Sequence, residues 1–107
     1  MTDFDIEKTR QSAKQALTEL ELPEETHTRC FAILDDRRTR DILTERNADG
    51  IIAGAIYVAG ILTENRLTQQ SLADVMDVSE ATIRKYYALL AKVLELKKKK
   101  EDRKSVV

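Results

Sequence analysis

The chain has little of several residue types that mark particular protein classes. Its 107 residues include one cysteine, one proline, three glycines and no tryptophan, and aromatic residues make up 5%. A lone cysteine, Cys30, excludes an internal disulfide framework and is typical of a reducing compartment inside the cell. Because glycine and proline are scarce while charged residues reach 35%, the composition favours helices over strands.

Long apolar segments are also missing. The most apolar stretch, residues 51–62, is shorter than the roughly 20 residues that a membrane-spanning helix needs. The N-terminal segment MTDFDIEKTR is acidic and amphipathic, unlike a signal peptide. We therefore expect a soluble, intracellular and monomeric protein with no membrane partner. A chain of this length predicts one domain with one modest core.

Charge is unevenly distributed although the net charge is only −1. Residues 1–63 carry 8 Lys/Arg and 12 Asp/Glu, whereas residues 64–107 carry 10 Lys/Arg and 7 Asp/Glu. Basic character therefore accompanies the C-terminal half, and the segment 97–107 is predicted to be a basic, flexible tail. Such a run is either a solvated tail or a binding arm.

Apolar periodicity predicts five helices within a domain of residues 1–96. They cover about residues 3–20, 23–36 and 50–62, with two more within 68–94. Thr2 and Asp5 resemble a capping box for the first helix, and Pro23 suits the first turn of the second. The polar segment DDRRTRD and the following Ile42 and Leu43 are expected to form a connecting turn or a last helical turn. Asp49 is the expected N-cap of the next helix.

The third of these helices, GIIAGAIYVAGIL, is apolar on every side, which predicts a helix surrounded by others. Gly54 and Gly60 would each destabilise an isolated helix by about 1 kcal/mol. Their presence indicates that neighbouring helices approach its backbone closely.

The segment TQQSLADVMDVSEATIRKYY, residues 68–87, contains two short apolar patterns separated by a polar break. Thr68 and Ser79 are expected to cap two helices, and Asp77 is expected to take a left-handed turn conformation. Leu72, Val75, Met76 and Val78 would face the core, followed on the last helix by Ile83, Tyr86 or Tyr87, Leu90 and Leu94. This pattern predicts either a helix-turn-helix or an ordinary corner of a helical bundle.

A DNA-reading helix needs short polar or basic side chains near its N-terminus, opposite its buried stripe. The candidates on the last helix are Glu80, Ala81, Thr82, Arg84 and Lys85, with Ser79 as its cap. Gln69 and Gln70 begin the preceding helix, whose N-terminus would approach a phosphate.

The residues of this region closely resemble the second cyclin-like repeat of transcription initiation factor IIB and of archaeal transcription factor B. The most specific element is Thr-Ile-Arg at 82–84 followed by Tyr87. The other matching positions are Gly50, Ala53, Ala55, Tyr57, Ala59, Arg66, Thr68, Gln69, Val78 and Ala81. The resemblance extends weakly over residues 4–46.

This resemblance implies an all-α, five-helix cyclin-like bundle with a C-terminal helix-turn-helix at about 68–94. It further implies that the domain reads the promoter element flanking the TATA box and docks on TATA-binding protein. Ala81, Thr82 and Arg84 match family positions that meet this DNA, Gln69 matches one near the phosphates, and Arg66 and Thr68 support the motif. The location would be the cytoplasm or nucleoid of an archaeon or the nucleus of a eukaryote.

The sequence also departs from the family pattern. One cysteine and one histidine cannot supply the four ligands of a zinc ribbon, and no first cyclin repeat is present. Any contact with RNA polymerase would then use parts that this chain lacks. Asp77 replaces the usual turn glycine, and Ala81 is smaller than the usual branched residue. The chain is either a piece of a longer factor or a stand-alone relative.

Two other functions remain open at this point. His27 and Cys30 lie three residues apart on a helix, as in a nucleophile–base pair or half a metal site, but a cysteine beside Ile33 and Leu34 is more typical of a core. We therefore expect no enzyme activity, cofactor or metal. The stronger alternative is a cyclin-fold adaptor that binds a protein through its acidic N-terminal half, or a stand-alone helix-turn-helix regulator.

Overall fold

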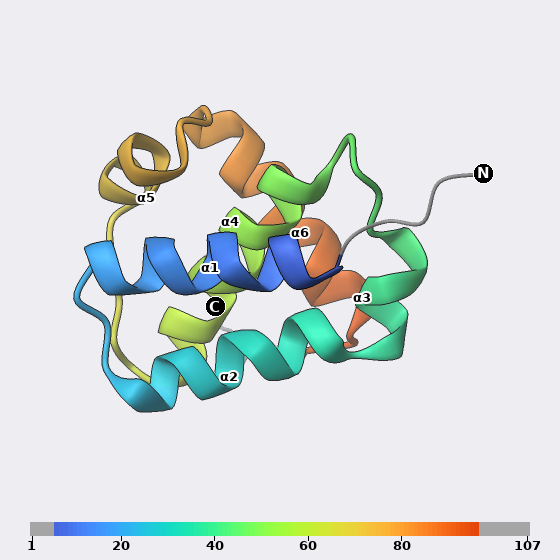
Figure 1. Ribbon diagram of the computed structural model, residues 1–107, viewed down its shortest axis with the longest axis horizontal. Coiled ribbons are helices and arrows are strands. Elements are labelled where there is room, and N and C mark those ends of the chain that lie inside the picture. Colours follow the sequence, from blue (N-terminus) through green and yellow to red (C-terminus); the bar gives the residue numbers. More distant parts are fainter. Residues whose placement is uncertain (1–5, 97–107) are drawn as a thin grey trace, which may run out of the picture.

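The computed structural model describes residues 6–96, which form six α-helices and no strand (Figure 1). The helices are α1 (Ile6–Glu19), α2 (Glu24–Asp35), α3 (Arg37–Ile42), α4 (Ala48–Leu62), α5 (Gln69–Met76) and α6 (Glu80–Val93). The predicted all-α class is therefore confirmed. The expected capping pair Thr2–Asp5 and the expected basic tail lie outside the described residues.

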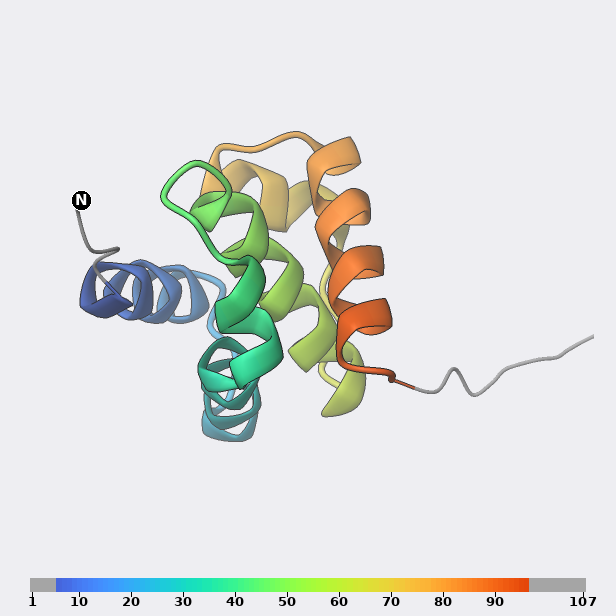
Figure 2. The same ribbon diagram turned by 90° about the vertical axis from the view of Figure 1, so that its right-hand side faces the viewer.

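Helix α4 is the centre of the bundle. It packs against α1, α2, α5 and α6, and Figure 2 shows it between α1 and α2 on one side and α6 on the other. Every residue from Gly50 to Gly60 is buried except Tyr57, which is half-buried. The prediction of a central helix is confirmed, although the helix begins two residues before Gly50.

Two glycines of α4 leave space for α6. A Cβ atom on Gly54 would lie 2.9 Å from the carbonyl carbon of Tyr86 and 3.0 Å from the backbone nitrogen of Tyr87. One on Gly50 would lie 2.4 Å from the ring of Tyr86. Since real Cβ atoms do not come so close to backbone, the two helices can cross at Gly54 only because it carries no side chain, while Gly50 leaves room for the ring of Tyr86.

Gly60 has a different role from the one expected. A Cβ atom there would lie 2.7 Å from Leu67 and 3.0 Å from the carbonyl oxygen of Asn65. These neighbours belong to the segment between α4 and α5 rather than to another helix. Gly60 therefore lets the chain fold back over the end of α4.

The prediction of five helices was wrong by one, because residues 37–42 form α3. Asp36 takes an extended conformation with φ −63° and ψ 136°, which ends α2. Its carboxylate accepts a hydrogen bond from the backbone nitrogen of Arg38 at 2.9 Å, so the same residue caps α3. Thr39 is fully buried within this short helix.

The predicted start of α4 was also wrong. Asn47, not Asp49, occupies the N-cap position, and its side chain makes no capping bond. Its Oδ1 atom accepts from the nitrogen of Thr44 and its Nδ2 atom donates to the carbonyl of Ile42, both at 2.8 Å. Asn47 therefore fixes the loop before α4, and Asp49 lies in the first helical turn.

Ion pairs join the first three helices. Asp35 on α2 pairs with Arg10 of α1 and with Arg40 of α3, and Asp36 pairs with Arg38. The hydrogen bond from Arg10 is the main cause that lowers the pKa of Asp35. Because Arg10, Asp35 and Arg40 are between 35% and 42% exposed, each pair that Asp35 forms stabilises the fold by no more than about 1 kcal/mol.

Four helices are followed by a residue in the left-handed conformation. The residues are Glu21, Glu64, Asp77 and Glu95, with φ between 56° and 61°. None of them is a glycine, which is the residue usually found at such positions.

Candidate nucleic-acid interface

Helices α5 and α6, joined by Asp77–Ser79, form a corner that we call the α5–α6 corner. The hydroxyl of Thr68 accepts a hydrogen bond from the nitrogen of Ser71, and that of Ser79 accepts one from the nitrogen of Thr82, both at 3.0 Å. Asp77 is left-handed, with φ 58° and ψ 46°. Both expected caps and the expected turn conformation are confirmed.

The inner side of the corner is anchored in the core by Leu72, Ile83 and Leu90, which are fully buried. The expected core residues Val75, Met76 and Val78 are only half-buried and pack at its edge. Leu94 is buried as expected.

Both candidate tyrosines share the inner side of α6. Tyr86 lies on the glycines of α4, and Tyr87 meets the ring of Tyr57 edge-on, with centroids 5.0 Å apart. Both tyrosines therefore face inward, and each is half-buried.

Beyond Glu80 at its first position, the outer side of α6 is small and basic. Its exposed residues include Ala81, Arg84, Lys85, Ala88 and Lys92. Because positions 3, 4 and 7 apart share a helix face, these five residues form one stripe, which we call the α6 outer face. Ala88 and Lys92 were not among the predicted site residues, although their spacing from Ala81 and Lys85 could have identified them.

Arg84 is the residue that links the two helices of the corner. Its Nη1 atom donates to Oε1 of Gln69 at 3.0 Å. The Nε2 atom of Gln69 in turn donates to the hydroxyl of Tyr57 at 3.4 Å. The structure thus brings together the first residue of α5 and the fifth of α6, both predicted from the sequence.

Lys85 points along a different direction from Arg84, as expected for residues about 100° apart around a helix. Its ammonium lies 5.3 Å from the ring centre of Tyr86. No carboxylate of the described residues forms an ion pair with Lys85, Arg84 or Lys92. These three cations are therefore available to an anion.

The remaining predicted site residues divide into two groups. The hydroxyls of Thr68 and Ser79 are occupied by capping bonds, and Thr82 is half-buried beside Ser79, 2.9 Å from it between hydroxyl oxygens. Three others are exposed at the edge of the corner, namely Arg66, Gln70 and Glu80. The side chains of the first group bond to the helix ends, so a ligand would be contacted by the exposed side chains of the second group.

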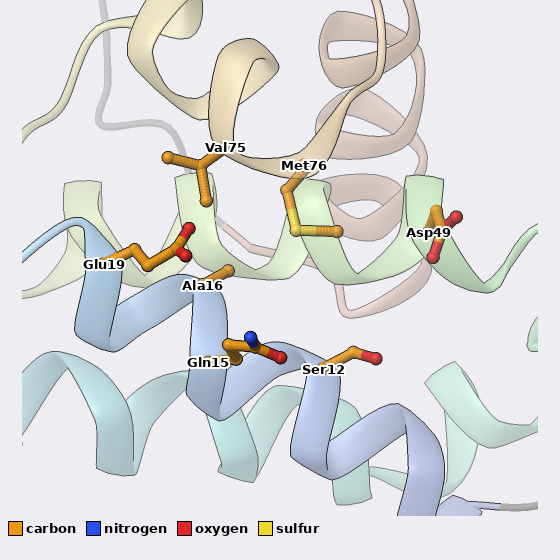
Figure 3. A pocket seen from close by; sticks show the side chains of 7 residues that line it. All are labelled: Ser12, Gln15, Ala16, Glu19, Asp49, Val75 and Met76. Atoms are coloured by element: carbon orange, nitrogen blue, oxygen red, sulfur yellow. The ribbon is translucent and has the colours of Figure 1, made fainter.

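A shallow cleft of about 270 Å³ lies on the other side of α5, between α1 and the start of α4. Figure 3 shows Val75 and Met76 pointing from the end of α5 toward α1. The charged residues of its lining, Glu19 and Asp49, are both acidic. A phosphate would be repelled here, so the cleft and the α6 outer face suit different partners.

The cysteine has no features of a nucleophile. Cys30 is fully buried, and burial raises its pKa to about 12, so the thiolate is scarce at neutral pH.

Within residues 6–96 no group of three or more His, Cys, Asp and Glu side chains could hold a metal ion. No helix of the same residues is long and apolar enough to cross a membrane.

An all-α bundle of this kind agrees with the cyclin-like repeat of a family of transcription factors. The family model described as "Transcription factor TFIIB repeat" matches residues 2–93, and the chain belongs to this family. The resemblance inferred from the sequence is therefore confirmed at the family level. The family consists of transcription factors rather than enzymes, which agrees with the expectation of no enzyme activity.

Relatives named transcription initiation factor IIB are similar over 79 residues. The factor of Methanococcus maripaludis is 38% identical, over 74% of this chain and 23% of its own length. The factor of Pyrococcus furiosus is 34% identical, over 74% of this chain and 26% of its own length. The chain thus spans about a quarter of the length of the curated relatives it matches.

Proposed function

We propose that this domain binds promoter DNA through the α5–α6 corner, which acts as a helix-turn-helix, and corresponds to the second cyclin-like repeat of its family. In this proposal α6 enters the major groove and reads the element flanking the TATA box. A second surface of the domain docks on TATA-binding protein. Any contact with RNA polymerase would be made by other parts of a longer factor.

The α6 outer face is the observation that supports this proposal most. It combines two alanines, which allow close approach to base edges, with three cations that pair with no carboxylate among residues 6–96. Arg84 can form a forked contact to guanine, while lysines contact phosphates. Both helices of the corner are capped at their N-termini, so their orientation is well defined.

The domain alone should bind DNA weakly, because few cations face the groove and affinity depends on the number of phosphates neutralised. Binding should become much tighter when TATA-binding protein occupies the same promoter, since two weak contacts to one assembly reinforce each other. The experiment is a gel shift of a TATA-containing duplex with the 107-residue chain, with and without that protein. Equal affinity in both cases would instead indicate a stand-alone helix-turn-helix regulator.

A second candidate function is a protein-binding adaptor, favoured by the acidic cleft beside Val75 and Met76. Salt separates the two functions. Phosphate contacts by two or three cations should lower log K by roughly 0.9 per contact for each log unit of salt. A partner held mainly by apolar contacts in the cleft would show little salt dependence and no preference among DNA sequences.

A further inference from the structure

Four residues form a continuous set of contacts from the centre of the bundle to the α6 outer face. Tyr87 on α6 supports the ring of Tyr57 on α4 edge-on, at 5.0 Å and 74°. The hydroxyl of Tyr57 accepts from Gln69 on α5 at 3.4 Å, and Gln69 accepts from Arg84 at 3.0 Å. The contacts therefore start and end on α6, having crossed two other helices.

The chemistry of these groups fixes the orientation of the amide. A guanidinium can only donate hydrogen bonds, so Gln69 must turn its oxygen toward Arg84. Its nitrogen is then left facing the hydroxyl oxygen of Tyr57, which accepts. Because Tyr57 is half-buried and held by Tyr87, Gln69 is restrained from both sides.

This arrangement leaves one edge of the Arg84 guanidinium without a hydrogen-bond partner among the described residues. The bond to Gln69 uses Nη1, so the edge formed by Nε and Nη2 still offers two parallel donors. Two parallel donors are what the O6 and N7 acceptors of guanine require. An arginine held in place also loses less rotamer freedom on binding than a mobile one.

We propose that Gln69 is a positioning residue which, anchored by Tyr57, holds the guanidinium of Arg84 in a reading position and so sets base preference. This inference rests on the proposed function, since it concerns the same DNA surface. It assigns Gln69 an action through Arg84, in place of the phosphate contact expected from the sequence, and adds Tyr57 to the functional residues.

The first test needs no DNA. Nitrogen relaxation of the Arg84 Nε–H group should show a restrained side chain in the free 107-residue chain, compared with the exposed Arg66 as internal reference. Gln69→Ala should make Arg84 as mobile as Arg66, whereas Gln69→Glu, which keeps the acceptor, should not. Tyr57→Phe removes only the hydroxyl and should loosen Arg84 partly. Gln11→Ala, the same change at an exposed glutamine of α1, is the matched control and should leave the relaxation of Arg84 unchanged.

The second test measures base preference on duplexes with a randomised flank beside a TATA box, bound with TATA-binding protein. Gln69→Ala should reduce discrimination at one base pair by about three- to tenfold, as expected when a side chain must be immobilised on binding. In the Arg84→Ala background the same change should have almost no further effect, because residues that act as a unit are not additive. Melting temperatures should be unchanged.

The two tests separate the inference from the function on which it rests. If Arg84 is as mobile as Arg66 in the wild-type chain, or if the effects of Gln69→Ala and Arg84→Ala simply add, the positioning role is wrong while DNA binding stands. If Arg84 is restrained by Gln69 but Arg84→Ala leaves DNA binding unchanged, the proposed function fails and the positioning role falls with it.

Discussion

Three arginines of α1–α3 and the cations of α6 have different partners. Arg10, Arg38 and Arg40 are each paired with an aspartate, whereas Arg84 is bonded to the neutral amide of Gln69. Lys85 rests against a tyrosine ring. An arginine paired with a carboxylate has little charge left for a phosphate. The two pairs of Asp35 connect helices, whereas the cations of α6 have no carboxylate partner within residues 6–96 and are available for binding.

The two regions also differ in how their helices are joined. Ion pairs on the surface connect α1, α2 and α3, while α6 lies directly against the backbone of α4 at Gly50 and Gly54. A steric contact of this kind fixes position without using charge. The comparison teaches that α6 can remain charged on its outer side because packing on its inner side already holds it.

The largest expected effect comes from breaking the contact between α4 and α6. Gly54→Leu places a side chain where a single Cβ atom would already lie 2.9 Å from the backbone of Tyr86. Overpacking typically costs about 1–3 kcal/mol and sometimes more, so the melting temperature should drop strongly or the chain should not fold. Thermal unfolding followed by circular dichroism measures the change.

The matched control for Gly54 is Ala32→Leu on the exposed side of α2. It introduces the same leucine side chain at a solvent-facing position, although alanine already carries the Cβ atom, and should alter stability by less than about 0.5 kcal/mol. Equal melting temperatures for the wild-type chain and Gly54→Leu would mean that α4 and α6 do not cross at this glycine.

The next effect concerns Arg84 and Lys85 on the α6 outer face. Arg84→Ala should weaken promoter binding by roughly 1–3 kcal/mol and flatten discrimination among flanking sequences. Lys85→Ala should weaken binding to all sequences alike and lower the salt slope by about one contact. Titrations of specific and scrambled duplexes in the presence of TATA-binding protein give both quantities.

Both side chains are exposed, so neither change should alter helix content. A lower melting temperature with unchanged sequence preference after Arg84→Ala would show that Arg84 has only a structural role. Such a structural role would come from the hydrogen bond to the neutral Gln69 rather than from an ion pair with an acidic residue.

A smaller effect is expected from the cap of α6. Ser79→Ala removes the acceptor that the nitrogen of Thr82 uses at 3.0 Å, which should lower stability by about 1 kcal/mol. Ser79→Asp keeps an acceptor and should restore most of the loss in chemical denaturation. If Ser79→Ala is as stable as the wild-type chain, the hydroxyl does not cap α6.

The smallest effect concerns the ionic region. The pKa of Asp35 is lowered by Arg10 and Arg40, so the charged form stabilises the folded state above the ordinary pKa of an aspartate. This contribution is lost as pH falls through the lowered pKa. Asp35→Asn should therefore reduce stability by no more than about 1 kcal/mol at about pH 7, and by less at about pH 2.5.

Urea unfolding at the two pH values measures this difference. Asp74→Asn is the control, because Asp74 is exposed on α5 and belongs to none of the three ion pairs. A penalty for Asp35→Asn that stays constant with pH would show that the ion pairs do not connect the first three helices.

Features that depend on neighbours in the sequence could be predicted. The caps Thr68 and Ser79 and the left-handed Asp77 follow from local hydrogen bonding, and the central helix follows from its unbroken apolar composition. Helix α3 was missed because its cap, Asp36, lies in a segment that composition alone describes as polar. A helix start can be predicted from local sequence only where a polar residue is recognised as its cap.

Contacts between distant residues could not be predicted. Asp35 and Arg10 are 25 positions apart, and Gln69 and Arg84 are 15 apart. Such pairs depend on helix positions and on side-chain rotamers, neither of which periodicity determines. The sequence predicts that Gln69 and Arg84 belong to one DNA-binding surface, but it does not predict the hydrogen bond between them.

The left-handed acidic residues have a consequence for engineering this domain. Side chains other than glycine, asparagine and aspartate are strained in that conformation, and Glu21, Glu64 and Glu95 each adopt it after a helix. Glycine at each position should relieve up to about 1 kcal/mol. All three lie outside the α5–α6 corner, so a heat-resistant form of the domain could be obtained by changing the ends of its helices and leaving the α6 outer face untouched.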